Sequence, residues 1–154
     1  MDYYNSLSKG YNALHKEEQL RKLATIKEYL PKGALILDVG CGTGLSSMLG
    51  DIIGIDPSRQ LLIQAQFPTV EGIAESLPFK DCSFDAVISV TALHHCTDVK
   101  KAIGEMRRVS KGTIIISTLK KAKQYAALEL EIANQLHIIR AIDDSIDTIY
   151  VCTI

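Results

Sequence analysis

The chain has 154 residues, of which 47% are hydrophobic and 23% are charged, and its formal net charge is −1. This length suits one domain over residues 1–154 with a single core, and the balanced charge gives no sign of a nucleic-acid-binding protein. The longest apolar runs are too short to cross a bilayer, and the polar N-terminus lacks the apolar segment of a signal peptide. We therefore expect a cytoplasmic protein with no membrane partner.

An amphipathic helix is predicted over residues 16–30, where apolar residues fall on one stripe and Pro31 follows. The stripe consists of Leu20, Leu23, Ala24 and Leu30. A tyrosine-rich lead precedes this helix and contains Tyr3, Tyr4 and Tyr11. We interpret residues 1–30 as an N-terminal lid and helix.

From residue 34 onward, short apolar runs alternate with helical stretches, a pattern that predicts βαβ units and a mostly parallel sheet. The runs that we expect to form strands are residues 34–39, 51–56, 69–74, 84–90, 112–118, 137–143 and 147–154. The last two would close the sheet as a strand pair.

Four helices are expected between these strands. A short one follows the first strand at residues 45–49, and the next begins at Pro57 and ends before Pro68. The third starts after Asp98, a plausible N-cap, and stops at Gly112, with inward-facing Ile103, Met106 and Val109. The last covers residues 122–136 and has one apolar face, formed by Tyr125, Leu128, Ile132 and Leu136.

The most informative stretch is a glycine turn, in which the strand at residues 34–39 runs directly into Gly40, Gly42 and Gly44. Glycine permits a positive φ and a close approach of a ligand to the backbone. In a dinucleotide fingerprint the third glycine would come one residue later, and here Asp38 precedes the first. A carboxylate would repel a pyrophosphate but attract the sulfonium and ammonium groups of S-adenosylmethionine.

The run LDVGCGTG at residues 37–44 resembles motif I of class I S-adenosylmethionine-dependent methyltransferases. The resemblance continues at Asp56, at the end of the second expected strand, in the stretch from residue 71 to 96, and in EMRRVSKGTIIIS at residues 105–117. It covers residues 33–118 and is closest to the small-molecule branch with quinone-ring and sterol-type methyltransferases. It implies an α/β, Rossmann-like, doubly wound sheet of seven mostly parallel strands. The C-terminal strand would be antiparallel and helices would cover both faces, with residues 33–118 as cofactor-binding core and 119–154 as closing helix and strand pair.

The resemblance also implies the cofactor, S-adenosylmethionine, its product S-adenosylhomocysteine, and a set of binding residues. Asp56 would accept hydrogen bonds from the ribose hydroxyls, although it could also simply cap the following helix. Ala74 and Glu75 would lie beside the adenine, and Val90 and Thr91 would face the methionine part. An N-terminal tyrosine would reach the cofactor's carboxylate, or the terminus could be only loosely attached. The full set is Tyr11, Asp38, Gly40, Cys41, Gly42, Asp56, Pro57, Ala74, Glu75 and Val90.

One position departs from the family pattern. Ile73 replaces an acid that often contacts the adenine amino group, so adenine recognition would depend on backbone groups and on packing by Pro57 and Ile73. Core packing is as good an explanation of Ile73 and Ala74.

Methyl transfer from a sulfonium is an in-line displacement, which mainly requires alignment and exclusion of water. We therefore nominate no catalytic residue. His94 and His95, just beyond the fourth expected strand, could supply a base if the acceptor must lose a proton, but structural roles explain them as well. No metal site is expected, because His94-His95-Cys96 has no second pair of ligands.

The acceptor is expected to be a small molecule. Basic residues in the second half could face RNA, but acids interrupt them and no aromatic residues alternate with them. The stretch VTALHH also lacks the N-P-P-Y/F sequence of amide and exocyclic amine methyltransferases. The alternative is a cofactor-binding scaffold, or a partner-dependent subunit of a heteromeric RNA or protein methyltransferase, because so short a chain leaves few residues to cover the substrate. A second copy or an activating protein could complete that site.

Overall fold

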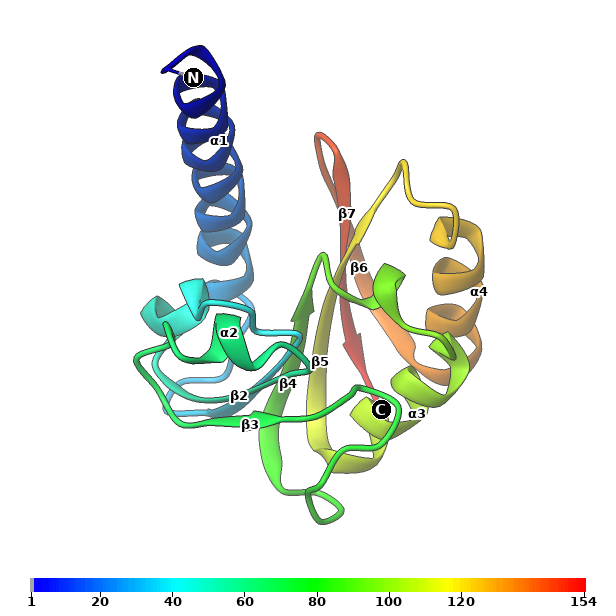
Figure 1. Cartoon of the computed structure of the whole chain (residues 1–154). Coiled ribbons are helices and arrows are strands. Elements are labelled where there is room, and N and C mark those ends of the chain that lie inside the picture. The colour runs from blue at the N-terminus through cyan, green and yellow to red at the C-terminus, as the bar shows by residue number, and fades with distance from the viewer. Residues whose placement is uncertain (1) are drawn as a thin grey trace.

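The computed structural model describes the backbone of residues 2–154 and the side chains from residue 13 onward. Figure 1 shows helices packed around one central sheet. The helices are α1 (Asp2–Lys27), α2 (Arg59–Leu62), α3 (Val99–Val109), α4 (Tyr125–Gln135) and the short 3₁₀ helices η1 (Leu45–Leu49) and η2 (Leu93–His95). The strands are β1 (Leu35–Val39), β2 (Asp51–Asp56), β3 (Thr69–Glu71), β4 (Phe84–Val90), β5 (Ser110–Leu119), β6 (His137–Asp144) and β7 (Asp147–Thr153).

The sheet has the strand order β3-β2-β1-β4-β5-β7-β6. Strands β1 to β5 pair in parallel, whereas β7 is antiparallel to both β5 and β6. This confirms the predicted doubly wound, Rossmann-like fold. The strand order reverses between β1 and β4, and ligands bind at such a switch point, outside the carboxyl ends of the strands.

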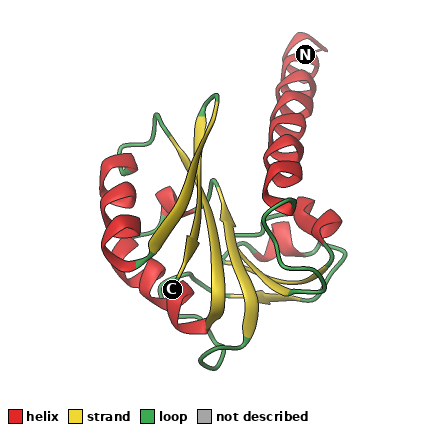
Figure 2. Cartoon of the chain, turned by 180° about the vertical axis from the view of Figure 1, so that it is seen from behind, coloured by secondary structure: helices red, strands yellow, loops and turns green. Residues whose placement is uncertain are grey.

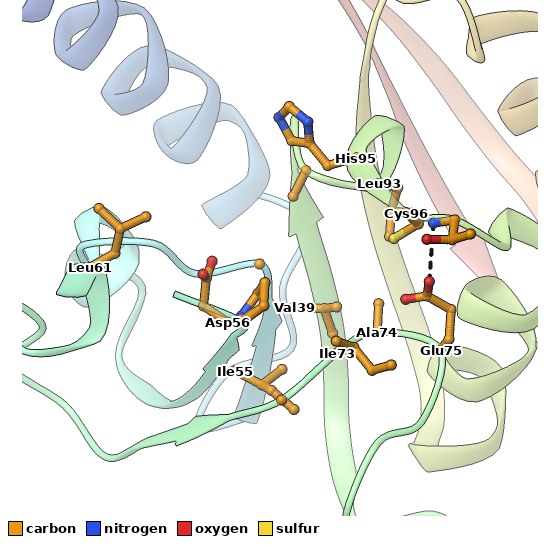
Figure 3. Close-up of a pocket in the computed structure, with 15 residues that line it drawn as sticks. Val39, Ile55, Asp56, Leu61, Ile73, Ala74, Glu75, Leu93, His95 and Cys96 are labelled. Atoms are coloured by element: carbon orange, nitrogen blue, oxygen red, sulfur yellow. Dashed lines mark hydrogen bonds between the residues drawn. The ribbon is translucent and has the colours of Figure 1, made fainter. Parts of the chain in front are cut away.

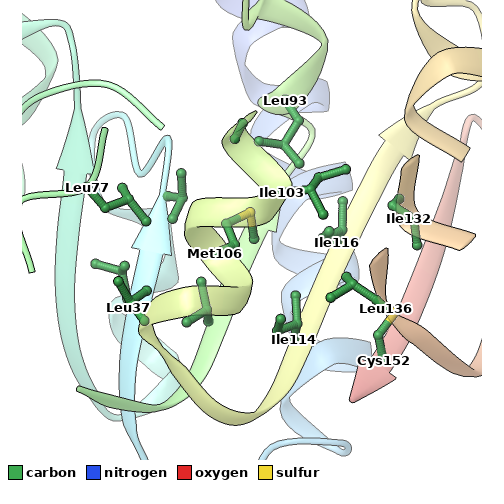
Figure 4. Close-up of a cluster of buried hydrophobic side chains, with 14 of the residues drawn as sticks. Leu37, Leu77, Leu93, Ile103, Met106, Ile114, Ile116, Ile132, Leu136 and Cys152 are labelled. Atoms are coloured by element: carbon green, nitrogen blue, oxygen red, sulfur yellow. The ribbon is translucent and has the colours of Figure 1, made fainter. Parts of the chain in front are cut away.

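Helices cover both faces of the sheet, as Figure 2 shows from behind. On one face, Leu23 and Ile26 of α1 pack with Ile36 and Ile88 of the sheet. On the other, α3 and α4 bury their apolar faces against the strands (Figure 4), including Ile103, Met106, Leu128 and Ile132. Each central strand is therefore buried on both sides, which explains why its sequence is a continuous apolar run.

Helix α1 differs from its prediction in length and in its buried face. It extends from residue 2 rather than from residue 16, so the tyrosine-rich lead is part of the helix, whose N-terminal end projects away from the sheet (Figures 1 and 2). The predicted stripe is correct only in part: Leu23 is buried and Leu30 is half-buried, but Ala24 is exposed and Leu20 is 36% exposed. Lys22 and Ile26, which were not predicted to face inward, are buried. Lys22 faces the sheet because its ammonium group pairs with the buried Asp147, which the apolar pattern of the helix does not reveal.

Two other helix boundaries differ from expectation. Helix α2 spans only residues 59–62. Its N-cap is Ser58 rather than Asp56, and the Ser58 hydroxyl accepts from the Leu61 amide. Helix α3 starts after Asp98 as predicted, and that side chain accepts from the Lys101 amide. However, α3 ends at Val109, and Gly112 lies within β5 rather than at the helix end. In the described part of the chain, no helix is long and apolar enough to cross a membrane.

Candidate active site

The glycine turn after β1 is fixed against the end of β2. The amides of Gly40 and Cys41 both donate to the Ile55 carbonyl, at 2.8 and 3.1 Å. Gly40, Gly42 and Gly44 have φ angles of 78°, 55° and 86°, a region that favours glycine. At Gly40 a side chain has no room, because an added Cβ would lie 2.5 Å from the Ala92 Cβ. The turn therefore brings the ends of β1, β2 and β4 together.

Asp56 ends β2 with both carboxylate oxygens oriented by backbone amides. Its Oδ2 accepts from the Gly42 amide at 3.0 Å, and its Oδ1 accepts from the Ser58 amide at 2.8 Å. A carboxylate oxygen can accept more than one hydrogen bond, so each oxygen keeps acceptor capacity for a ligand. Both oxygens of the oriented carboxylate can therefore accept a further hydrogen bond.

Asp38 lies buried beneath the glycine turn. The Ser46 hydroxyl of η1 donates to its Oδ2, whereas its buried Oδ1 has no hydrogen-bond partner among the described residues. Burial raises the pKa of Asp38 to about 6, the Ser46 hydrogen bond opposes this rise, and the nearby Asp56 charge adds to it. An unpartnered carboxylate oxygen of this kind suits a cationic group such as an ammonium.

A cavity of about 330 Å³ opens at the carboxyl ends of β1, β2 and β4 (Figure 3). Its walls are mostly apolar, and among the described side chains the lining includes the acidic residues Asp56 and Glu75 but no lysine or arginine. The lining comprises Val39, Gly40, Ile55, Asp56, Pro57, Leu61, Gly72, Ile73, Ala74, Glu75, Ala92, Leu93, His95, Cys96 and Thr97. This size and this combination of apolar walls with a few polar groups are typical of a small-ligand pocket.

The segment after β3 and the segment after β4 are joined across one rim of this cavity. Glu75 Oε2 accepts from the Thr97 amide at 3.1 Å and from the Asp98 amide at 3.5 Å, and Figure 3 shows this side chain directed at the residues after η2. Burial and the Glu75 charge raise the pKa of the neighbouring Cys96 thiol to about 11. Cys96 is therefore a neutral part of the wall.

Residues 37–116 match the family model described as a methyltransferase domain. The chain belongs to this family. The match begins in β1 and ends in β5, so it contains the glycine turn, Asp56 and all the described residues that line the cavity. The resemblance to class I S-adenosylmethionine-dependent methyltransferases is thus confirmed.

Three curated relatives are similar to this chain over about two thirds of its residues. An uncharacterized protein of Methanocaldococcus jannaschii is 38% identical over 71% of this chain and 47% of its own length. A malonyl-[acyl-carrier protein] O-methyltransferase of Erwinia billingiae is 35% identical over 66% of this chain and 44% of its own. A tRNA (carboxymethyluridine(34)-5-O)-methyltransferase of Arabidopsis thaliana is 37% identical over 67% of this chain and 28% of its own. The chain therefore spans half or less of the length of these relatives.

Two solved structures share the fold over nearly their whole length. A methyltransferase from Thermotoga maritima, described as a possible histamine N-methyltransferase, has a TM-score of 0.77 with 20% identity, over 98% of this chain and 96% of that one. A methyltransferase from Haloferax volcanii, solved in complex with the Trm112 methyltransferase activator, has a TM-score of 0.75 with 16% identity, over 97% and 94%. At these identities the likeness concerns the fold of the methyltransferase domain.

The structure brings half of the predicted binding residues together around the cavity: Gly40, Asp56, Pro57, Ala74 and Glu75. Ile73, the position that departs from the family pattern, also lines it.

Four further predicted residues, Asp38, Cys41, Gly42 and Val90, do not line the cavity. Gly42 touches Asp56 through its amide, and Asp38 is beneath the turn. The Cys41 thiol faces β2, since a Cβ on Gly54 would lie 2.5 Å from its sulfur, and Val90 packs on the face covered by α1. The side chain of Tyr11, like those of Tyr3 and Tyr4, lies outside the described residues.

Sequence reasoning missed Ser46 and the wall formed by Leu93, Cys96 and Thr97. A serine two residues after Gly44 gives a weak signal for Ser46, whereas nothing in the sequence indicates how the chain turns after β4.

The two histidines stack on each other at the end of β4, with ring centroids 3.9 Å apart and planes tilted by 42°. His95 lines the cavity and is exposed, whereas His94 is half-buried. Burial and the neighbouring His95 lower the pKa of His94, and Asp147 opposes this effect. Within the described residues, no group of three or more His, Cys, Asp or Glu side chains is placed to hold a metal ion.

Proposed function

We propose that this methyltransferase domain binds S-adenosylmethionine in the cavity and transfers the sulfonium methyl group to an acceptor by in-line displacement. The observation that carries the proposal is the Asp56 carboxylate at the cavity wall, oriented by the Gly42 and Ser58 amides with acceptor capacity left on both oxygens. Two neighbouring ribose hydroxyls would donate to it.

The charges around the cavity favour this ligand over a nicotinamide dinucleotide. In the part of the chain whose side chains are described, the lining offers the carboxylates of Asp56 and Glu75 and no lysine or arginine for a pyrophosphate. Asp38, with its unpartnered Oδ1 under the turn, would attract the ammonium of the methionine part. The apolar side chains of Leu61, Ile73 and Leu93 would pack on the adenine and exclude water.

The bound cofactor supplies a methyl group that is already activated by the positive sulfur. The domain would contribute alignment: the glycine turn and Asp56 would fix the adenosine end, and Asp38 would fix the amino-acid end. No proton transfer is built into this arrangement, so His94 and His95 stay unassigned. An acceptor that must be deprotonated would find them at the carboxyl edge of the sheet.

We further propose that the acceptor is a small molecule rather than a nucleic acid. Several basic residues in the second half of the chain form ion pairs. Arg108 pairs with Asp81 and Glu105, Lys111 pairs with Asp85, and Lys120 pairs with Asp143. Charges that are compensated in this way make a weak phosphate-binding surface. Since one relative is named as a tRNA methyltransferase and another acts on an acyl-carrier-bound malonyl group, both acceptor classes belong in the assay.

The proposal is tested by calorimetric titration of the purified chain with S-adenosylmethionine, S-adenosylhomocysteine and NAD in parallel. We expect both adenosyl ligands to bind and NAD to give no heat of binding. Binding of NAD alone would contradict the cofactor assignment. Binding of none of the three would favour a partner-dependent subunit, and the titration would then be repeated with a Trm112-type activator, the kind of partner present in the Haloferax volcanii complex.

A further inference from the structure

A buried polar cluster lies behind the carboxyl end of β4. Lys22 of α1 and Asp147 at the start of β7 form an ion pair with 3.0 Å between Nζ and Oδ2, and neither side chain is exposed. Thr91, the residue after β4, joins both partners: Lys22 Nζ donates to its hydroxyl at 2.8 Å, and the hydroxyl donates to Asp147 Oδ2 at 2.7 Å. With Ser117 of β5 these residues form the Lys22 cluster, and none of them lines the cavity.

The cluster holds Thr91 in an unusual backbone conformation. Its φ is 52°, in the left-handed region that β-branched residues rarely adopt. Besides the two hydroxyl contacts, the Thr91 amide donates to the Ser117 hydroxyl at 2.8 Å and to the Ser117 carbonyl at 3.1 Å. Strained conformations persist only where several contacts enforce them, and they concentrate at functional sites.

The direction of the chain at Thr91 decides where one wall of the cavity stands. The next residue, Ala92, packs so closely on Gly40 that no Cβ would fit there. Ala92 begins the segment of residues 92–97, which supplies the cavity wall from η2 and its flanks. A change in φ at Thr91 would therefore swing this wall away from the glycine turn.

We infer that the Lys22 cluster is a positioning device for the cofactor pocket. Lys22 and Asp147 keep Thr91 in its left-handed conformation, and Thr91 in turn keeps residues 92–97 against the glycine turn. The role of the cluster in binding rests on the proposed function, since it takes the cavity to be the cofactor site. Without the cluster, the wall loosens and cofactor binding weakens, although no cavity residue has changed.

A neighbouring ion pair provides a matched control. Arg21 and Asp144 join the same helix to the same β6–β7 hairpin, with 3.4 Å between Nε and Oδ1, but Arg21 is 53% exposed. This pair connects α1 to the hairpin alone, whereas Lys22 also donates to Thr91. Arg21→Met therefore removes a cationic attachment of α1 without altering the cluster.

The first test measures hydrogen exchange in the free protein. Thr91→Val keeps the size and β-branching of the side chain but removes the hydroxyl. We expect the amides of His95, Cys96 and Thr97, which are hydrogen-bonded within the wall, to exchange at least about tenfold faster, while those of β1 keep their rates. Thr91→Ser, which keeps the hydroxyl, and Arg21→Met should both behave like the wild type.

The second test measures S-adenosylhomocysteine affinity. We expect weaker binding by at least about fivefold both in Thr91→Val and in the double variant Lys22→Met/Asp147→Asn, which alters only side chains buried away from the cavity. If the wild type does not bind, the proposed function is contradicted for the isolated chain, and the exchange test still decides whether the cluster holds the wall. If the wild type binds and Thr91→Val leaves the exchange of residues 95–97 unchanged, the inference is wrong, whatever the affinity of this variant for S-adenosylhomocysteine. If the double variant fails to fold, Thr91→Val alone decides.

Discussion

Asp56 is the residue on which the cofactor assignment depends most directly. Asp56→Ala removes the acceptor for two ribose hydroxyls, and hydrogen bonds to a charged group contribute about 1.5–3 kcal/mol each. We expect S-adenosylhomocysteine to bind at least about tenfold more weakly in calorimetric titration. Glu71→Ala is the matched control, because Glu71 is the neighbour of Asp56 in the β2–β3 strand register, is exposed, and does not line the cavity. Equal affinities of the two variants would remove Asp56 from the site.

Asp38 gives ligand binding a pH dependence with a defined sign. Because burial raises its pKa from 3.8 to about 6, the folded protein keeps a proton that the unfolded chain loses between those values. The stability of the free protein therefore falls as pH rises from 3.8 to about 6. A cationic ligand needs the carboxylate, so its affinity should rise over the same range and level off above it.

Between pH 7 and pH 5 we expect S-adenosylhomocysteine affinity to drop by about tenfold, as linkage to one group with this pKa requires. Calorimetry over this pH range measures the drop, and Asp38→Asn provides the comparison, since it should bind weakly with little pH dependence. If the affinity of Asp38→Asn fell between pH 7 and pH 5 as much as that of the wild type, the pH dependence would come from another group, such as a histidine.

At the residue scale, the predicted site residues could be identified from the sequence, but the residues that hold them in place could not. Asp38, the glycines and Asp56 were recognised because each lies in or directly after the last residues of an expected strand, in a motif with fixed spacing. Ser46, Thr97 and the roles of Lys22 and Asp147 were not, because their contacts join residues far apart in the chain or depend on its path through short loops. A buried lysine in particular contradicts the pattern from which a helix face is predicted.

At the scale of secondary-structure elements, two substitutions in the glycine turn separate the cost of backbone strain from the cost of a steric clash. Gly40 and Gly42 both have positive φ, so alanine at either position should cost about 1–2 kcal/mol of conformational strain. Only at Gly40 would the new Cβ also lie 2.5 Å from the Ala92 Cβ, whereas the Cβ at Gly42 has free space. We therefore expect Gly40→Ala to lower the free energy of unfolding by clearly more than Gly42→Ala, as measured by urea denaturation.

Gly42→Ala is thus the control for backbone strain, and the test compares the free energies of unfolding of the two variants. If Gly42→Ala is the more destabilised, the turn does not pack against Ala92 as described. The same comparison bears on binding, because Gly40→Ala should also displace the wall that begins at Ala92.

Element types were predicted more successfully than element ends. All seven strands were foreseen, because buried parallel strands give short apolar runs that turn residues separate. Helix bounds were predicted less accurately: α2 spans residues 59–62 instead of 57–67, and α3 ends at Val109 instead of at Gly112. At the end of α3, the pairing of Ser110 with Phe84 of β4 starts the strand two residues before its expected beginning.

On the scale of the whole molecule, one continuous sheet links the cavity to the closing hairpin. Strand β5 pairs with β4 on one side and with β7 on the other, and the apolar cluster under α3 and α4 includes residues of β1, β2, β5 and β7. We propose that residues 1–154 unfold as one cooperative domain. A ligand that binds only the folded state would then stabilise every strand equally, including β7.

This equality can be measured by native-state hydrogen exchange. At a free S-adenosylhomocysteine concentration of about 100 times its dissociation constant, a folded-state ligand adds about 2.7 kcal/mol to the free energy of unfolding. The slowest amides of β1 beside the cavity and of β7 beyond β5 should therefore both slow by about 100-fold. Slowing confined to β1–β5 would mean that the β6–β7 hairpin opens independently of the cofactor-binding core. In that case Lys22 and Asp147 would join two units that unfold separately.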